Sequence, residues 1–249
     1  MIRMALRALP APTLCMNTMT RAPNGNVRAP RLDSSTYDRW FDSPWGQYAF
    51  TVESGIVLDA MGPLSCGVSV LDAGCGTGRL TALLEASGAS VAGLDLDREM
   101  LDISSVRTHG HLVLGDADCL PFSDGAFDRV VAVTLCEFAT DPDAVFSELA
   151  RVTRPGGRNV VGSLNPRSPL GSRWRGRLQL PPWRGAHFLS RRRLLTLARP
   201  SGHLSIRGAP YAPGLFPGLQ MFGPMFERLG RLLPAFGAFQ VVTIERSEP

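Results

Sequence analysis

Lysine is absent from this chain of 249 residues, so all 26 of its basic residues are arginines. The sequence also lacks an apolar run of about 18 residues, the length that a transmembrane helix needs. Its five cysteines are an odd number and form no C-x-x-C pair, which gives no indication of a disulfide framework or a zinc site. We therefore expect a protein of the reducing cytoplasm, with no metal.

Acidic and basic residues are separated along the chain. Residues 33–148 hold 19 acids and five arginines, whereas residues 149–226 hold 13 arginines and no acid. The two regions are expected to do different jobs. Residues 1–32 hold five arginines, four prolines and no acid. We expect them to be a flexible tail, or the result of a start codon assigned too early, and residues 33–249 to form one domain.

Short apolar runs alternate with helical patterns over most of the chain, which implies a parallel sheet covered on both faces. In such sheets ligands bind at the carboxyl ends of the strands. A turn is expected at Gly156-Gly157. Pro44 and Gly46 are expected to interrupt the first helical region. The expected strands are 68–72, 90–95, 112–114, 127–133, 159–163, 203–208 and 239–244, and the expected helices are 34–61 (one or two), 79–87, 97–106, 141–152, 190–197 and 225–233.

The most informative segment is V-L-D-A-G-C-G-T-G-R, from Val70 to Arg79. A dinucleotide-binding loop has the pattern G-x-G-x-x-G. Here the third glycine, Gly78, comes one residue early, and Arg79 stands where that pattern needs glycine. Asp95 lies at a spacing that suits a ribose contact, so an NAD-dependent oxidoreductase remains a less favoured alternative. The sequence G-K-[ST] is missing from the segment, which excludes a P-loop.

The same segment, D-x-G-x-G-x-G after an apolar strand, resembles motif I of the class I S-adenosylmethionine-dependent methyltransferases. Tyr37-Asp38-Arg39-Trp40-Phe41 is similar to the Y-D-x-W-F start of many small-molecule members, including the quinone and sterol type. Residues 149–157 look like the family's turn before the fifth strand. The resemblance covers residues 34–164 and points to the methyltransferase type 11, quinone-methyltransferase-like group. It implies an α/β fold: a Rossmann-like, doubly wound, seven-stranded sheet, mostly parallel with an antiparallel last strand.

The resemblance implies that S-adenosyl-L-methionine is the cofactor. In the family, the acid at Asp72 helps to hold the ammonium side, the glycines form the floor, and the acid at Asp95 accepts bonds from both ribose hydroxyls. Leu96, after the second strand, and the Ala117 backbone, after the third, would meet the adenine, and Asp116 would accept a hydrogen bond from the adenine amino group. Tyr37 would close over the cofactor. The predicted cofactor-binding residues are Tyr37, Asp72, Gly74, Cys75, Gly76, Gly78, Asp95, Leu96, Asp116, Ala117 and Leu135.

Methyl transfer from a sulfonium is an in-line displacement, in which a protein mainly aligns the acceptor with the methyl group and excludes water. A general base is needed only where the acceptor must lose a proton. The sequence therefore demands no catalytic residue, and Glu137, His187 and Tyr211 are the candidates. An inactive S-adenosylmethionine-binding partner subunit stays open as an alternative to an enzyme.

Residues 165–189 are rich in Pro, Arg, Trp and Gly, and we expect them to form a basic, lid-like insertion. The insertion lies within the basic segment 149–226, whose arginines suit an anionic acceptor, because guanidinium binds carboxylates bidentately. With its tryptophans it would also suit peripheral contact with an anionic membrane. A solvated basic face is a third interpretation. Nucleic acid is expected least, because no recognition module is present. The expected acceptor is a small or lipid-like molecule.

Overall fold

The computed structural model describes residues 33–165, 167–168, 186–209 and 237–248. Most of the expected insertion at 165–189, the helix expected at 225–233 and the candidate Tyr211 lie outside the described residues.

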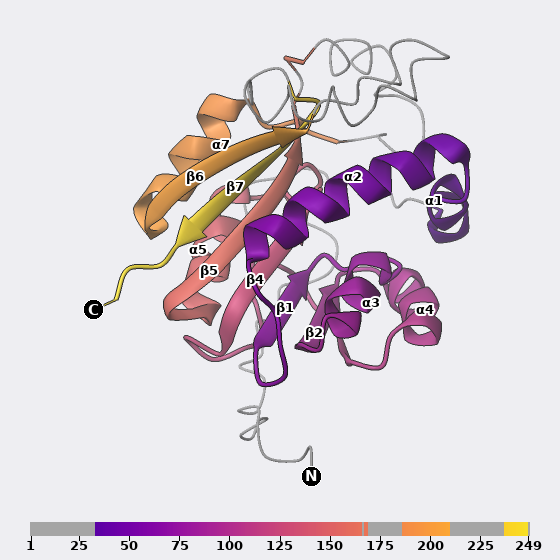
Figure 1. Cartoon of the computed structure of the whole chain (residues 1–249), viewed down its shortest axis with the longest axis horizontal. Coiled ribbons are helices and arrows are strands. Elements are labelled where there is room, and N and C mark those ends of the chain that lie inside the picture. Colours follow the sequence, from indigo (N-terminus) through magenta and orange to yellow (C-terminus); the bar gives the residue numbers. More distant parts are fainter. Residues whose placement is uncertain (1–32, 166, 169–185, 210–236, 249) are drawn as a thin grey trace.

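The described strands form one sheet of seven strands, in the order β3-β2-β1-β4-β5-β7-β6 (Figure 1). The first five pair in parallel, and β7 runs antiparallel to both β5 and β6. The order reverses between β1 and β4, which is the point where doubly wound sheets bind ligands. This topology confirms the predicted fold. The strands are β1 (Ser69–Ala73), β2 (Ser90–Asp95), β3 (His111–Leu114), β4 (Phe127–Val133), β5 (Thr153–Leu164), β6 (His203–Ala209) and β7 (Phe239–Glu245).

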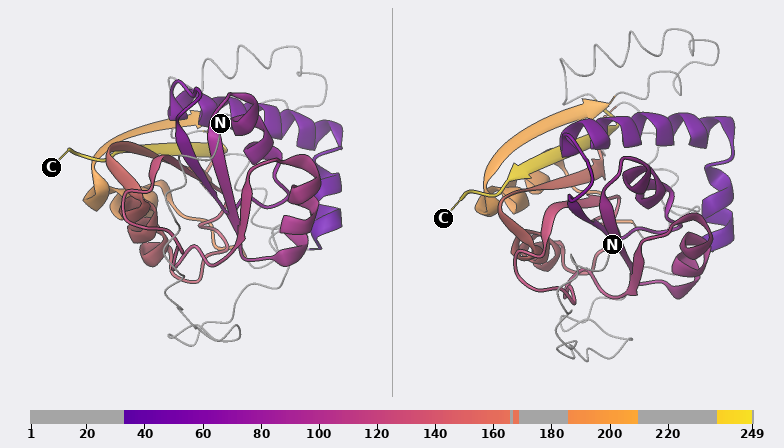
Figure 2. Two further views of the ribbon diagram at one scale, coloured as in Figure 1. Left: turned by 90° about the horizontal axis from the view of Figure 1, so that it is seen from below. Right: turned by 60° about the horizontal axis from the view of Figure 1, so that its bottom comes forward.

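Helices cover both faces of the sheet (Figure 2). The described ones are α1 (Ser34–Trp40), α2 (Pro44–Met61), α3 (Arg79–Ala86), α4 (Arg98–Arg107), α5 (Pro142–Val152) and α7 (Arg191–Ala198), followed by a 3₁₀ turn at Arg199–Ser201. Figure 1 shows α2 lying across the face of the sheet that is opposite to α5.

The strands β1, β2, β4, β5 and β7 bury side chains on both faces, because successive residues point to opposite sides. On β1, Val70 belongs to the apolar cluster under α2 and α3, whereas its neighbour Leu71 belongs to the cluster under α5 and α7. Val160 and Val161 on β5 divide in the same way. Two-sided burial explains why these strands read as continuous apolar runs in the sequence.

Short polar residues cap the N-termini of several helices, at the starts that the sequence predicts. Asp97 accepts a hydrogen bond from the Glu99 N–H at 2.9 Å and is the N-cap of α4. Asp141 accepts bonds from two backbone N–H groups and is the N-cap of α5. The prediction that Pro44 and Gly46 interrupt the first region was wrong in detail. The break lies before Pro44, which is the first residue of α2, and Gly46 lies in the first turn of that helix.

The prediction of a turn at Gly156-Gly157 was also wrong, because both glycines lie within β5, which begins at Thr153. Phe127 of β4 pairs with Thr153, but Arg129 pairs with Arg158, so the residues between form an irregularity in the ladder. Gly156 has a positive φ of 70° there. Its N–H donates to the Arg246 carbonyl at 3.0 Å, which ties the irregularity to the end of the chain.

Candidate functional site

A cavity of about 670 Å³ lies at the carboxyl ends of β1, β2, β3 and β4. The residues at these strand ends form one wall. Tyr37, Trp40 and Phe41, from α1 and its end, form another together with Ala49 and Phe50 of α2. The cavity therefore occupies the position where the order of the sheet predicts a ligand.

The segment from Gly74 to Gly78, here called the glycine loop, forms the floor of this cavity. Gly74 and Gly78 are packing glycines: a Cβ would lie 2.9 Å from Leu135 Cδ1 at the first, and 2.2 Å from Ser104 Oγ at the second. Gly76 differs, because the nearest atom to a Cβ there is Tyr37 Cε1, at 3.9 Å. With a positive φ of 53°, Gly76 presents bare backbone to the open space. A loop of this kind lets a ligand approach the main chain closely.

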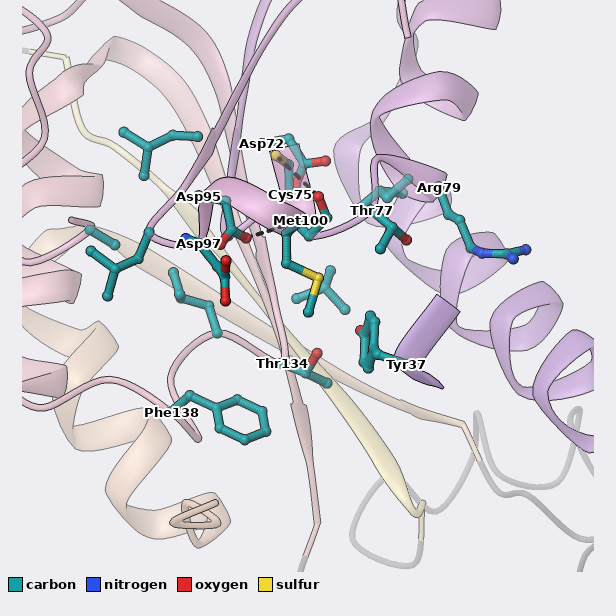
Figure 3. Close-up of a pocket in the computed structure, with 18 of the residues that line it drawn as sticks. Tyr37, Asp72, Cys75, Thr77, Arg79, Asp95, Asp97, Met100, Thr134 and Phe138 are labelled. Atoms are coloured by element: carbon teal, nitrogen blue, oxygen red, sulfur yellow. Dashed lines mark hydrogen bonds between the residues drawn. The ribbon is translucent and has the colours of Figure 1, made fainter. Parts of the chain in front are cut away.

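Asp95, at the end of β2, holds the loop in place. Its Oδ2 accepts a hydrogen bond from the Gly76 N–H at 2.8 Å, and its Oδ1 accepts one from the Asp97 N–H at 2.9 Å. Burial raises the pKa of this carboxyl, although the backbone hydrogen bonds act in the opposite direction. Figure 3 shows the Asp95 side chain beside Asp97 and below Asp72, and all three line the cavity.

Asp72 lies deeper in the same lining. Only 2% of the residue is exposed, and its Oδ2 accepts a hydrogen bond from the Thr81 hydroxyl at 2.6 Å. Burial raises the pKa of the Asp72 carboxyl to about 7, and the nearby charge of Asp95 acts in the same direction. A buried carboxyl of this kind ionises more readily when a cation is beside it.

The residues expected to meet adenine lie together on the cavity wall. Of the eleven predicted cofactor-binding residues, all line the cavity except Gly78, which is the N-cap of α3. Leu96 is 43% exposed, although it is a large apolar side chain, and Ala117 is buried beside Asp116. Asp118, for which the sequence indicates no role, also lines this wall. Its N–H donates to Asp116 Oδ1 at 3.2 Å and shapes the turn.

Tyr37 of α1 projects into the space bounded by Thr77, Met100 and Thr134 (Figure 3). Burial raises the pKa of its hydroxyl, so the side chain is a neutral phenol at physiological pH. Its neighbour Asp38 points to the flanks of the glycine loop and makes an ion pair with Arg79, with Nε and Oδ1 2.9 Å apart. The sequence gives no sign of a partner for Asp38 or Arg79.

Thr134, directly after β4, is another lining residue that the sequence analysis missed. It is the one non-glycine residue in the described part of the chain with a positive φ, at 51°. This conformation is costly for a β-branched residue and marks strain beside the cavity. Phe138 follows in the same segment and adds an aromatic ring to the lining (Figure 3).

The two catalytic candidates that the structure describes, Glu137 and His187, lie outside this lining. Glu137 is fully buried away from the cavity lining, and its Oε1 accepts hydrogen bonds from the Ser163 hydroxyl at 3.0 Å and the Leu164 N–H at 2.7 Å. Burial raises the pKa of the Glu137 carboxyl to about 7. His187 is exposed and lies outside the lining. Its backbone N–H donates to the backbone carbonyl of Glu137 at 2.6 Å. In the described structure Glu137 therefore joins β5 to the chain that returns at residue 186.

The described lining is acidic. Six of its residues carry a carboxyl group and two carry a guanidinium, and one of those two, Arg79, is paired with both Asp38 and Asp42. Such a wall favours a cationic ligand and disfavours a pyrophosphate. The charged lining residues are Glu53, Asp72, Asp95, Asp97, Asp116, Asp118, Arg79 and Arg98.

Two further observations bear on partners. Among the described residues, no group of three or more His, Cys, Asp or Glu side chains is arranged to hold a metal ion. Within the same ranges, no helix is both long enough and apolar enough to cross a membrane.

Comparison with known proteins identifies the relatives of this chain. The family model described as a methyltransferase domain matches residues 71–161. The chain is 35% identical over 144 residues to the malonyl-[acyl-carrier protein] O-methyltransferase of Serratia marcescens, covering 57% of this chain and 56% of that protein. It is 30% identical over 162 residues to the ubiquinone biosynthesis O-methyltransferase of Xanthomonas oryzae pv. oryzae, covering 60% and 67%.

A solved structure shares the fold. The S-adenosylmethionine-dependent methyltransferase of Thermotoga maritima, described as a possible histamine N-methyltransferase, superimposes with a TM-score of 0.67 at 23% identity, covering 86% of this chain and 95% of that one. The chain spans little more than half the length of the Serratia relative, so the reaction of that protein does not follow for this one. The cavity, its glycine floor and these relatives together show that the chain belongs to the class I S-adenosylmethionine-dependent methyltransferases, whose cofactor is S-adenosyl-L-methionine.

Proposed function

We propose that this protein transfers the methyl group of S-adenosyl-L-methionine to a small or lipid-like acceptor by in-line displacement. One observation carries the proposal: a single cavity is bounded by the glycine loop, by the acid at the end of β2 and by an aromatic wall from α1 and α2. Its volume of about 670 Å³ falls in the range of small-molecule sites, about 300–1,000 Å³.

The residues present fit the cofactor. Gly76 leaves the space over the loop open, where a Cβ would project into it. Both oxygens of Asp95 keep acceptor capacity beyond the backbone bonds that they already hold. We infer that Asp95 binds the ribose hydroxyls, that Asp116 and Ala117 meet the adenine, and that Asp72 faces the ammonium group. S-adenosylmethionine supplies an activated methyl group on a sulfonium, whose leaving group is a neutral thioether.

The acidic lining separates this proposal from the alternative of an NAD-dependent oxidoreductase. A nicotinamide dinucleotide would place a pyrophosphate dianion at the glycine loop. That loop lies between the carboxyls of Asp72 and Asp95, and Arg79 beside it is paired with acids. A sulfonium and an ammonium group are cations, and they suit the same surroundings without a cost of like charge.

The acceptor is inferred from the aromatic wall. Trp40, Phe41, Phe50 and Phe138 line the cavity around Tyr37, and such rings bind flat or apolar groups and exclude water. Neither Glu137 nor His187 lies in the lining, so the contribution of the described residues to the reaction is alignment and desolvation. The described lining holds two arginines, Arg79 and Arg98, and Arg79 is paired with Asp38 and Asp42. An anionic acceptor would therefore need arginines from elsewhere in the chain.

A methyl-transfer screen with isotopically labelled donor tests the proposal. The acceptors are quinones, phenols, lipids, carboxylic acids and, as the contrasting class, RNA, with oxygen acceptors first because both curated relatives are named as O-methyltransferases. We expect label in one of the first four classes, and its loss in Asp95→Ala. Binding of the donor with transfer to none of these classes would favour an inactive binding subunit. Label in RNA would overturn the acceptor class.

A further inference from the structure

Asp38 connects α1 to both flanks of the glycine loop. Its Oδ1 accepts hydrogen bonds from the Thr77 hydroxyl at 2.7 Å and from Arg79 Nε at 2.9 Å. Its Oδ2 accepts one from Arg107 at 3.1 Å, and its backbone carbonyl accepts one from Arg79 at 3.0 Å. Thr77 lies in the loop, Arg79 is the first residue of α3 and Arg107 is the last residue of α4. One carboxylate thus joins four elements of the fold.

These contacts are shielded from solvent. The Asp38 side chain is 19% exposed, whereas Asp42, which also pairs with Arg79, is 64% exposed. Burial by itself would raise the pKa of Asp38, but hydrogen bonds from the two guanidiniums and the Thr77 hydroxyl outweigh it and lower the pKa to about 2. Asp38 is therefore ionised at physiological pH. Ion pairs in such partly buried surroundings are worth more than exposed ones, which contribute little.

The helix that this network holds is also a wall of the cavity. Tyr37, the residue before Asp38, lies over the loop with its Cε1 3.9 Å from the position of a Cβ on Gly76. The rings of Tyr37 and Phe41 stack edge to face, with centroids 5.2 Å apart, and Arg79 lies over the Phe41 ring at 5.2 Å. The guanidinium that binds Asp38 thus also supports the aromatic wall. A ligand on the loop would be covered by α1.

We propose that Asp38 is a positioning residue that keeps α1 closed over the glycine loop and so slows the release of S-adenosylmethionine and its product. The inference rests on the proposed function, because it takes this cavity as the cofactor site. Asp38 itself does not line the cavity and acts through Tyr37 and the loop. Opening of α1 requires its ion pairs to Arg79 and Arg107 to break, so their strength sets the residence time of the ligand.

The test measures how fast the cofactor leaves. Labelled S-adenosylmethionine bound to the full chain is displaced by excess S-adenosylhomocysteine, and retained label is followed by rapid filtration. In Asp38→Asn the dissociation rate constant should rise about tenfold, the order expected when charge-assisted hydrogen bonds are lost, while the association rate constant does not fall. Arg107→Gln should also raise the dissociation rate constant, because Arg107 donates both to Asp38 and to the Thr77 carbonyl of the loop. The double variant should exceed the stronger single variant only slightly.

Asp42→Asn is the matched control, because it removes an exposed acid that pairs with the same Arg79. Its dissociation rate constant should stay within about twofold of the wild type, as for an exposed pair. Unchanged dissociation in both Asp38→Asn and Arg107→Gln would overturn the inference, as would a lower association rate constant that accounts for all the lost affinity. If Asp38→Asn does not fold, Arg107→Gln decides. A wild-type chain that binds no S-adenosylmethionine would refute the proposed function itself.

Discussion

The carboxylate of Asp95 accepts a hydrogen bond from the backbone N–H of Gly76 at 2.8 Å. The same side chain accepts one from the Asp97 N–H, so a single acid fixes the middle of the glycine loop and the turn into α4. The backbone carbonyl of Leu94 completes the connection by accepting from the N–H groups of Gly74 and Cys75. The proposed ribose acceptor thus also sets the conformation of the loop, and ligand binding and loop order are coupled.

A methyl group on Gly76 should block the cofactor without unfolding the protein. Gly76→Ala places its Cβ in the cavity, 3.9 Å from Tyr37, whereas Gly67→Ala adds a Cβ with nothing within 4 Å. Both positions have positive φ, so both variants should lose about 1 kcal/mol of stability. Only Gly76→Ala should raise the Kd for S-adenosylmethionine, by about tenfold or more. Calorimetry measures the Kd, and equal Kd values in the two variants would refute the placement of the loop.

Cofactor binding should strengthen as the pH rises through about 7. Burial raises the pKa of Asp72 from 3.8 to about 7, so the carboxylate that we propose to face the ammonium group is half formed there. The α-ammonium itself stays protonated to about pH 7.7. We expect the Kd for S-adenosylmethionine to fall between pH 6 and 7.5, and this dependence to disappear in Asp72→Asn. Glu137→Gln is the control, because Glu137 has a similarly raised pKa but lies outside the cavity lining.

The stability of the unliganded protein should fall as the pH rises, because of the raised pKa values of Asp72 and Glu137. A carboxyl whose pKa is higher in the folded state than in the unfolded state stabilises the fold while it is protonated. This contribution is complete below the unfolded pKa, near 4, and is lost as the pH rises to about 7. The free energy of unfolding should therefore fall over this range. Denaturant titrations should show a shallower fall in both Asp72→Asn and Glu137→Gln. A fall of unchanged slope in both variants would contradict the two raised pKa values.

Relief of backbone strain at Thr134 should stabilise the protein. Asparagine adopts positive φ at less cost than a β-branched residue, so Thr134→Asn should gain about 0.5–1 kcal/mol of stability. Thr140→Asn is the control, because Thr140 also lines the cavity but has no positive φ. Thermal unfolding checks both, and a lower Tm for Thr134→Asn than for Thr140→Asn would mean that the threonine side chain stabilises the turn.

The strand pattern and the position of the proposed cofactor-binding residues could be predicted from sequence, for a physical reason. Strands buried on both faces read as apolar runs, and parallel strands bring their carboxyl ends to one edge. Asp72, Asp95 and Asp116 follow three such runs, and the structure places all three on the cavity. These three acids lie close together because of the order of the strands, which does not depend on how individual side chains pack.

The contacts of Asp38 could not be predicted in this way. Its partners Arg79 and Arg107 lie 41 and 69 residues further along the chain, and an acid on a helix surface gives no sign of which arginine it will meet. The burial of the Glu137 side chain away from the cavity could not be predicted either. The left-handed residue Thr134 turns the chain after β4, and threonine gives no sequence signal for that conformation, as glycine or asparagine would.

The most direct measurement is a calorimetric titration of the wild type and Asp95→Ala with S-adenosylmethionine and, separately, with NAD. Asp141→Asn is the control, because Asp141 lies outside the cavity lining and asparagine can replace it as the N-cap of α5. We predict one S-adenosylmethionine bound per chain, affinity lowered about tenfold or more in Asp95→Ala but not in Asp141→Asn, and no binding of NAD. Binding of NAD in preference to S-adenosylmethionine, or an affinity for S-adenosylmethionine that is unchanged in Asp95→Ala, would contradict this prediction.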